Sequence, residues 1–407
     1  MIFYRRNGKR NKSAIKRLLP LIVSAAVLLL LLIIFLSIRK NESVAESFTV
    51  SVSQFLVSLA GHITSVFPFS VYEWTVILVV AGLIALVVLG IIGLTKKRFF
   101  ACLKGLCIVT VVALSLGNLY TLTAGFAYYR SPLELSRSQT LYKGEVLLDI
   151  AAYFTDDLNE LNKQLKRDEK GNVIPPYSVK ELAKKLQEEY ERLSSDYFFK
   201  YTPKAKPMTN NWFMSSSGFT GVTFMPFGES NVNTMTPSSD LPATMAHELA
   251  HAKGVMRENE ANLVSYYILL TSSDPYLRYC GYFSVITTLY SAIAIGNNFD
   301  YEMADTFYDN IPPQFSQETY NAFKFWANYR GPFAFLTDFL DKAGRWFNDL
   351  YLKLNGAQNG EGSYQNPWDV VETPTVNPDT GEIEIEYTPV YSEIHKIFFY
   401  IYENSLG

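Results

Sequence analysis

Two histidines and an acid within one helical turn are the residues of this chain best suited to chemistry. The segment from Thr244 to Asn262 reads TMAHELAHAKGVMRENEAN, and it places His247, Glu248 and His251 in the pattern HExxH. Side chains four residues apart lie on one face of an α-helix, so the two imidazoles can bind one metal ion. Glu248 cannot reach the same point as a ligand, but it can take a proton from a water at that point. The spacing therefore predicts a Zn²⁺ site with Glu248 as the general base.

The alternative interpretation is an accidental match on an amphipathic helix. The chain has only four histidines, and a chance match of this pattern among them is on the order of one in several hundred. The surrounding residues also favour a site, because Met245 and Leu249 give the helix an apolar back and Gly254 can end it in a left-handed conformation. We therefore expect metal binding.

The third ligand has two candidates, Glu258 and Glu260, because no histidine follows closely. On a second helix, Glu258 shares a face with Ala261 and Asn262. Ala261 would let the two helices approach closely, and Asn262 could hydrogen-bond a ligand histidine. Glu260 shares its face with apolar residues, which is typical of packing. The pattern favours Glu258 as the third ligand and leaves Glu260 as the alternative.

Two helices must position these side chains. Ser239 or Asp240 can cap the first helix, which carries Pro242 in its first turn and should end near Gly254. A second helix is expected from around Arg257 through Tyr267. Upstream, a segment rich in glycine, phenylalanine and threonine, 215–233, fits one or two short strands.

Further elements are expected on both sides of this segment. The stretch 177–193 predicts an exposed helix, with Ser178 and Glu181 forming a capping box. The uncharged stretch 279–296 has a membrane span as its alternative, but its Ser and Thr content favours a buried helix. Near the end, 375–387 predicts a hairpin around Asn377 to Gly381, followed by a helix over 391–403.

The N-terminal third is expected to be a membrane module. Three uncharged stretches, 18–38, 74–95 and 105–129, are each long enough to cross a hydrocarbon core of about 30 Å. Basic residues precede the first stretch and follow the second, which places both clusters in the cytoplasm. This predicts a plasma-membrane protein with residues 39–73 and 130–407 outside and 96–104 inside. A cleaved signal peptide is the alternative for the first stretch, but its apolar run is too long and two further stretches follow.

Composition narrows the function classes and suggests three regions. The net charge of −3 gives no sign of nucleic-acid binding. Cys102, Cys107 and Cys280 are too few for a disulfide framework, and no C-x-x-C pair exists. The regions are a basic cytoplasmic tail (1–17), the membrane module (18–129) and a working domain (130–407). Within the module, 44–69 is expected to lie in the membrane interface, with His62 having no chemical role.

The motif resembles that of the gluzincin zinc metallopeptidases, in which HExxH is followed by a Glu in an E-x-x-A-[DN] context. The spacer from His251 to the acid is shorter than in most gluzincins. The chain is also similar to the bacterial membrane proteins called domain of unknown function 3810. The residues that carry the first resemblance are His247, Glu248, His251, Glu258, Ala261 and Asn262, and the segments that carry the second are FPFSVYEW (67–74), GVTFMPFGESNVN (221–233), HELAHAKG with RENEAN, and NDLYLKLNG (348–356).

These resemblances imply a mainly α fold, with three N-terminal transmembrane helices and an extracytoplasmic, zincin-like α+β domain that holds a small β-sheet. They imply that the strand 218–226 lies at a sheet edge beside the active-site helix and pairs with an extended peptide. Candidate substrate-binding residues there are Gly221, Phe224, Pro226, Glu229, Asn231 and Asn233, with turn formation as the alternative. Candidates for stabilising an oxyanion are His395, Tyr266 and Arg257, each of which also has a structural interpretation.

The sequence thus predicts a membrane-anchored zinc peptidase that faces the outside, with the lipid bilayer and a peptide or protein substrate as partners. A catalytically silent, metal-stabilised sensor or scaffold is the alternative. The intact Glu248 favours the peptidase, because a scaffold does not need a base. An intramembrane protease is disfavoured, because Lys253, Arg257, Glu258 and Glu260 crowd the motif.

Overall fold

The protein is mainly helical and divides into two compact units. The computed structural model describes the backbone of residues 2–96, 99–133, 145–193, 195–296, 301–328, 334–357, 369–376, 383–390 and 393–405. Unit 1 comprises residues 1–131 and 224–229, and unit 2 comprises the rest of the chain. The sequence did not predict that the short segment 224–229 belongs with the N-terminal helices.

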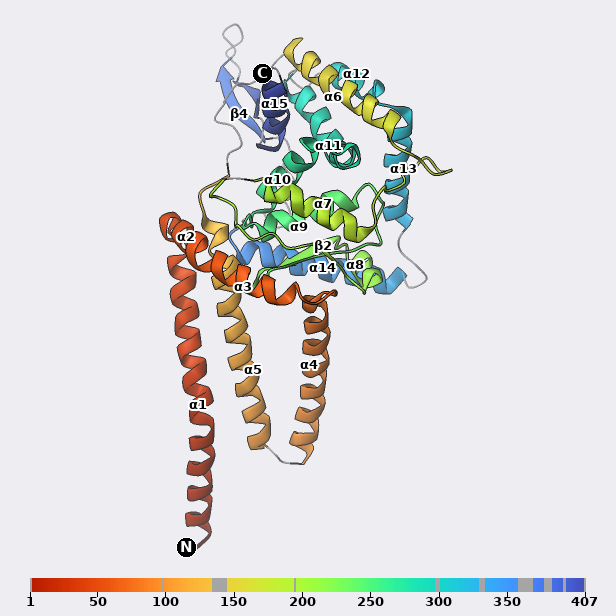
Figure 1. Ribbon diagram of the computed structural model, residues 1–407. Coiled ribbons are helices and arrows are strands. Elements are labelled where there is room, and N and C mark those ends of the chain that lie inside the picture. Colours follow the sequence, from red (N-terminus) through yellow and green to blue (C-terminus); the bar gives the residue numbers. More distant parts are fainter. Residues whose placement is uncertain are drawn as a thin grey trace. The chain divides into compact units, whose positions relative to one another are not determined.

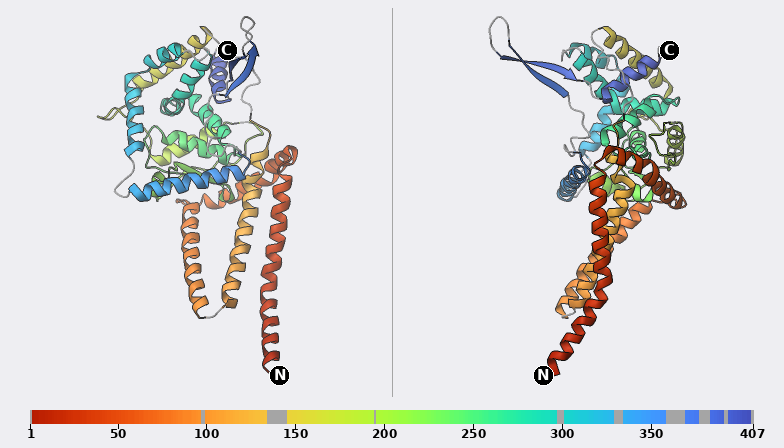
Figure 2. Two further views of the ribbon diagram at one scale, coloured as in Figure 1. Left: turned by 180° about the vertical axis from the view of Figure 1, so that it is seen from behind. Right: turned by 90° about the vertical axis from the view of Figure 1, so that its left-hand side faces the viewer.

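Unit 1 is built of helices (Figure 1). Helix α1 lies alongside α5, and α5 also contacts α4 (Figures 1 and 2). Short π-helical turns interrupt or end helices at Thr49–Ser53 and Thr121–Gly125. The helices are α1 (Ile2–Ile38), α2 (Glu42–Phe48), α3 (Gln54–Thr64), α4 (Val71–Thr95) and α5 (Phe99–Tyr120).

Among the described residues, five helical segments are long and apolar enough to cross a membrane. The segments Lys16–Ile38, Val71–Thr95 and Phe99–Gly125 are almost unburied, with 0%, 6% and 0% of their most apolar windows inside the protein. Their apolar side chains are therefore available to lipid. The segment Glu42–Thr64 is 28% buried, whereas Pro275–Gly296 is 67% buried and forms the expected core helix. The chain is a membrane protein, and the number of its spans stays a prediction.

Two boundaries in unit 1 differ from expectation. Helix α5 begins at Phe99 rather than at Gly105, so it includes Lys104. A lysine near the end of a membrane helix is tolerated because its stem can reach toward the interface. The stretch 44–69, expected to be an interfacial helix, forms α2 and α3, which run from Glu42 to Thr64, and its place in the membrane interface stays a prediction.

The segment 224–229 is held firmly within unit 1. Thr64 Oγ1 donates to the Phe227 carbonyl over 3.0 Å. Gly228 has a φ of +59°, and an added Cβ would collide with the Val57 carbonyl. Only glycine combines this left-handed backbone with so close an approach.

Ser70 and Glu229, the last residue of the same segment, together cap helix α4. Ser70 Oγ accepts from the Glu73 amide over 2.9 Å, in the usual N-cap geometry. The buried Glu229 carboxylate accepts from the amides of Val71 (3.2 Å) and Tyr72 (2.9 Å). Three N–H groups that the helix itself cannot satisfy thus find partners, and the negative charge lies at the positive end of the helix dipole.

Unit 2 packs around helix α11, which contacts α6, α9, α10, α12 and α15. Helices α6 and α12 run beside α11 (Figures 1 and 2). Buried side chains along α11 include Tyr279, Tyr282 and Leu289. The helices of unit 2 are α6 (Glu145–Gln164), α7 (Val179–Glu191), α8 (Asn211–Ser216), α9 (Leu241–Ala252), α10 (Glu258–Leu270), α11 (Pro275–Gly296), α12 (Glu302–Asp309), α13 (Pro313–Asn328), α14 (Ala334–Leu354) and α15 (Glu393–Ser405).

The described strands form two small sheets. The first contains β1 (Lys206–Pro207), β2 (Gly221–Phe224) and β3 (Glu229–Val232) in the order β1–β3–β2, so β2 lies at an edge, as expected. Strands β1 and β3 are parallel. The second is the antiparallel pair β4 (Asp369–Val376) and β5 (Ile383–Val390). This pair confirms the hairpin, whose expected turn at Asn377 to Gly381 lies outside the described residues.

Other expected elements are present with shifted ends. The capping box of Ser178 and Glu181 starts α7, as predicted. The strand-forming segment was expected to start at Ser215, but Ser215 and Ser216 belong to α8. The C-terminal helix α15 matches the predicted helix to within two residues at each end.

Candidate metal centre

Helix α9 carries the HExxH motif, and tertiary hydrogen bonds fix its start. Pro242 lies in its first turn, as predicted, but neither expected cap residue uses its side chain to cap the helix. Asp240 instead accepts from the Trp326 indole over 3.2 Å, and the Ser239 hydroxyl donates to Glu318. Asp240 occupies the N-cap position, as predicted, but it does not cap the helix with its side chain, because both side chains are committed to residues of α13.

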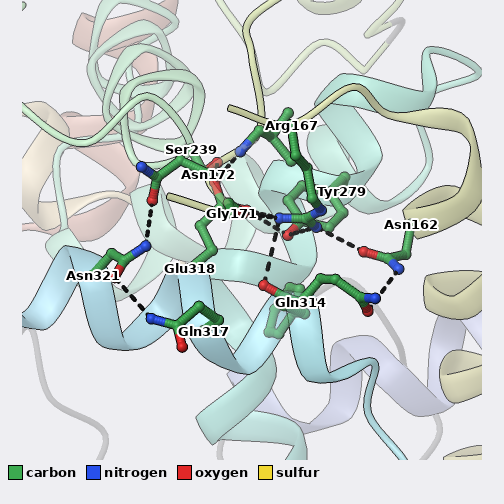
Figure 3. Close-up of polar contacts among 12 residues, drawn as sticks. Asn162, Arg167, Gly171, Asn172, Ser239, Tyr279, Gln314, Gln317, Glu318 and Asn321 are labelled. Atoms are coloured by element: carbon green, nitrogen blue, oxygen red, sulfur yellow. Dashed lines mark hydrogen bonds and ion pairs between the residues drawn. The ribbon is translucent and has the colours of Figure 1, made fainter. Parts of the chain in front are cut away.

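Glu318 is the centre of this network (Figure 3). Its buried carboxylate accepts from the guanidinium of Arg167 (2.8 Å), the hydroxyl of Tyr279 (2.7 Å) and the amide of Val173 (3.1 Å), in addition to Ser239. A buried charge with this many donors is well satisfied. The network ties Ser239, two residues before α9, to α13, α11 and the segment 167–173.

A tight turn after α9 returns the chain to the motif. Gly254 has a φ of +87°, and its amide donates to the His251 carbonyl over 2.9 Å. Helix α10 then packs directly against α9. Ala246, Ala250 and Ala261 are fully buried, and such small side chains allow two helices to approach closely.

This packing brings His247, His251 and Glu258 together. One ligand atom from each lies within 4.8 Å of the others. The Nε2 atoms of the two histidines are 3.0 Å apart, and Glu258 Oε2 lies 3.1 Å from His247 Nε2 and 3.3 Å from His251 Nε2. Within the described part of the chain, this is the one group of three or more such side chains that could hold a metal ion.

The other ring nitrogen of each histidine is also engaged. His247 Nδ1 lies 2.8 Å from Asn262 Oδ1, and His251 Nδ1 lies 2.8 Å from the Val255 carbonyl. Both partners are acceptors, so each Nδ1 carries a proton, and each Nε2 faces Glu258. The contact to Asn262 is the one expected from the sequence.

Burial and charge shape the ionisation of these groups. Burial opposes the charge of Glu258, but His251 and His247 beside it hold its pKa well below the usual range. Burial also opposes a charge on His251, yet the Glu258 carboxylate raises the pKa of His251 to about 9. A cation in the site would replace that proton, so metal binding releases a proton.

Glu248 has surroundings of its own beside strand β2. Its carboxylate is buried and accepts from the Thr223 hydroxyl over 2.7 Å. Burial raises the pKa of Glu248, although both histidines act in the opposite direction. Gly221 of β2 lies so close that an added Cβ would come within 2.5 Å of Glu248 Oε1. The edge strand therefore contacts the expected base directly.

Glu260 is directed elsewhere. It pairs with Arg257 at 2.6 Å and accepts from the Leu133 amide over 3.1 Å. The structure thus brings Glu258, and not Glu260, to the two histidines. The role of Glu258 as a metal ligand stays a prediction.

A cleft of about 340 Å³ opens beside His247 and Glu248. One wall is the segment from Ser217 to Gly221, and the opposite wall is α14. Gly344 allows the two walls to meet, because an added Cβ would come within 2.8 Å of the Ser217 carbonyl. The α14 residues that line the cleft are Asp341, Gly344, Arg345 and Asn348.

These α14 residues were not identified from the sequence. Their spacing of three or four residues places them on one helical face, and the segment NDLYLKLNG begins at one of them, Asn348. Their common helical face and the segment NDLYLKLNG are the sequence features that could have identified them.

Comparison with known families gives one match. The family described as "Protein of unknown function (DUF3810)" matches residues 48–371. The chain belongs to this family. No curated protein and no solved structure matches the chain.

The part of the chain that matches the DUF3810 family extends from α2 into β4 and includes the whole candidate site. His247, Glu248, His251 and Glu258 lie inside it, as does the α14 wall of the cleft. The matched range of this chain therefore contains both the histidine pair and most of the unit 1 helices, and the description of the family names no activity.

Several residues expected at the site have other roles in this DUF3810 protein. Glu229 caps α4, Phe224 stacks near Tyr72 with ring centroids 5.0 Å apart, and Pro226 is buried. Asn231 donates to the Val222 carbonyl, and Asn233 to the Ser215 hydroxyl. These side chains make structural hydrogen bonds or packing contacts, and their roles as substrate contacts stay predictions. Of the predicted strand residues, Gly221 lines the cleft.

The role of the three candidates for oxyanion stabilisation also stays a prediction. None of them lines the cleft as far as the structure describes it. Arg257 pairs with Glu260, and His395 Nε2 lies 3.0 Å from the Ser291 hydroxyl. Tyr266 is half-buried on α10. Arg345 of α14 is the cationic side chain that the structure places in the cleft.

Proposed function

We propose that this protein is a membrane-anchored, zinc-dependent peptidase with a gluzincin-like site, whose unit 2 lies outside the cytoplasm. The observation that carries the proposal is the convergence of His247, His251 and Glu258, with Glu248 beside them in a cleft. Two imidazoles and one carboxylate are a donor set that catalytic zinc sites use, and they leave one position open.

The residues present fit a zinc ion. Both histidines are held by acceptors at Nδ1, which orients Nε2 toward the carboxylate of Glu258. Bound zinc lowers the pKa of a coordinated water toward about 7 and polarises a substrate carbonyl. His247, His251 and Glu258 would hold the ion. Glu248, on the same helix, is left for proton transfer.

Glu248 is suited to act as general base and then as general acid. One carboxylate oxygen accepts from Thr223, which fixes the orientation of the group. Burial raises its pKa, and a base works best when its pKa lies closer to the working pH. As the water oxygen bonds to the carbonyl carbon, its proton passes to Glu248. The same proton then moves to the amide nitrogen as the C–N bond breaks.

Strand β2 supports a peptide as the substrate. It is an edge strand, and Thr220 and Gly221 line the cleft next to Glu248. An extended peptide can add to such an edge through main-chain hydrogen bonds, which brings its carbonyl to the site. Arg345 and Asn348 on the opposite wall are positioned to contact its side chains.

The test is Glu248→Gln in the full chain, purified in detergent. The variant keeps all three proposed ligands, so its zinc content by elemental analysis should equal that of the wild type. Its hydrolysis of a peptide library should fall by roughly 10²- to 10⁴-fold, because the proton acceptor is lost. Equal hydrolysis by both proteins would refute the mechanism. Zinc binding by the wild type without any cleavage would favour the sensor or scaffold alternative.

A further inference from the structure

Helix α14 has two opposite faces of different character. One face lines the cleft through Asp341, Gly344, Arg345 and Asn348. The other carries large apolar side chains that are exposed: Phe339 (66%), Trp346 (62%), Leu350 (38%) and Leu354 (67%). On a helix of 3.6 residues per turn, these four positions fall within about 80° of one another and about 180° from the cleft-lining face.

So large an apolar stripe is unusual on a surface that faces only water. We propose that this outer face of α14, defined by Phe339, Trp346, Leu350 and Leu354, binds the interfacial region of a lipid bilayer.

The composition of the stripe fits a lipid interface. Tryptophan and phenylalanine favour the region where the headgroups meet the acyl chains. Lys342 and Lys353 are exposed and border the stripe on one side. Lys353 pairs with Asp349 at 2.7 Å, and the ammonium group of Lys342 can reach phosphates while its stem covers apolar surface. An amphipathic helix with this arrangement lies along the membrane surface rather than across it.

The apolar helices of unit 1 bring unit 2 to a bilayer. The last of the almost unburied apolar segments ends at Gly125, and unit 2 begins at Pro132. Leu133 is already fixed to unit 2 by its hydrogen bond to Glu260. So short a connection keeps unit 2 at a high effective concentration near the lipid surface, whereas a second copy of the chain would have to find this face by diffusion.

Binding of α14 to the bilayer would place the cleft close to the lipid. Because α14 separates the apolar stripe from Asp341 and Arg345, the cleft lies about one helix diameter, roughly 10 Å, from the lipid. A peptide segment that has just left the bilayer would reach it more readily than one held far from the surface.

The test uses the tryptophan at position 346 in the full chain, reconstituted in phosphatidylcholine vesicles with brominated acyl chains. The emission of the wild type minus that of Trp346→Phe reports on this residue alone. We expect bromolipid to quench this difference emission, and aqueous acrylamide to quench it weakly. Trp74→Phe, at the start of an apolar segment, is the positive control, and Trp326→Phe, whose indole is bonded to Asp240, is the negative control.

Two results would overturn the proposal. Strong quenching by acrylamide without quenching by bromolipid would show that the face lies in water. Protection from both quenchers, together with a dimer by light scattering in detergent, would show that a second copy covers the face. Trp346→Phe changes an exposed side chain conservatively, and the unchanged emission of the control tryptophans would verify that the variant is folded.

Discussion

At the scale of single residues, two acids only two positions apart have unrelated surroundings. Glu258 lies against His247 and His251, whereas Glu260 pairs with Arg257 and binds the Leu133 amide. Residues two positions apart on a helix lie on different faces, so Glu258 and Glu260 cannot serve the same site. This divergence makes the pair a natural internal control for the metal site.

We expect Glu258→Gln to abolish zinc binding and Glu260→Gln to preserve it. A neutral amide is a poor ligand for zinc and leaves the site with two histidines. Elemental analysis of the purified full chains measures the difference, with His247→Ala as the reference for a lost ligand. Retention of zinc by Glu258→Gln and its loss from Glu260→Gln would reverse the assignment.

The contact between Gly221 and Glu248 gives a second residue-scale prediction. In Gly221→Ala the new methyl group must displace the carboxyl group of Glu248, because the two would come within 2.5 Å. A displacement of about 1 Å at a catalytic group lowers kcat/KM by roughly 10- to 100-fold. Zinc content should stay at the wild-type level, since Gly221 does not contact the ligands. Peptide hydrolysis at unchanged kcat/KM would show that the base does not depend on this contact.

Much of the candidate site could be anticipated because its signals are local. The pattern HExxH, the glycine that ends α9 and the facing argument for Glu258 and Asn262 all depend on residues within one short segment. For the α14 wall, the spacing of residues gives only a common helical face. That this face lines the cleft depends on tertiary packing at Gly344, which no local pattern reveals.

At the scale of elements, the same distinction applies to helix ends. The capping box of α7 formed as predicted because Ser178 and Glu181 satisfy each other locally. At α9 the equally suitable Ser239 and Asp240 were drawn into bonds with Glu318 and Trp326. A cap is predictable from sequence where no distant partner competes for its side chain.

The Glu318 network yields a prediction for stability. Glu318→Gln keeps the shape of the side chain but places an amide among four donors and leaves the Arg167 guanidinium without its carboxylate. Breaking such a buried pair costs about 3 kcal/mol or more. We expect a clearly lower Tm by circular dichroism in detergent. Glu160→Gln, which removes an exposed partner of Lys163, is the matched control and should leave Tm unchanged. Equal Tm values for all three proteins would show that the network contributes nothing to stability.

At the scale of the whole molecule, hydropathy and charge predicted the division into N-terminal apolar helices and a larger unit. They did not predict that 224–229 joins the N-terminal unit, because its contacts to Thr64, Val71 and Tyr72 bridge more than a hundred residues of sequence. The buried character of α11 was predictable only in part. Its apolar length fits a span, and its surroundings in unit 2 decide that it is a core helix.

The stability of unit 2 should depend on pH through His395. This residue of α15 is 3% exposed and lies 3.0 Å from the Ser291 hydroxyl of α11. Burial lowers its pKa to about 4, from an ordinary value of 6.5. Between these values the unfolded chain binds a proton that the folded protein does not. Stability that is fully present above pH 6.5 is therefore lost as the pH falls toward 4, by about 3 kcal/mol.

His395→Gln isolates this contribution, because glutamine can also hydrogen-bond Ser291 but does not titrate. The free energy of unfolding of both proteins, measured by denaturant titration in detergent from pH 7 to pH 4, should fall less steeply for the variant. The metal site and the carboxylates titrate in both proteins, so their effects cancel in the comparison. Parallel pH profiles would mean that His395 takes up its proton in the folded state as readily as in the unfolded chain, and that α15 opens locally to admit it.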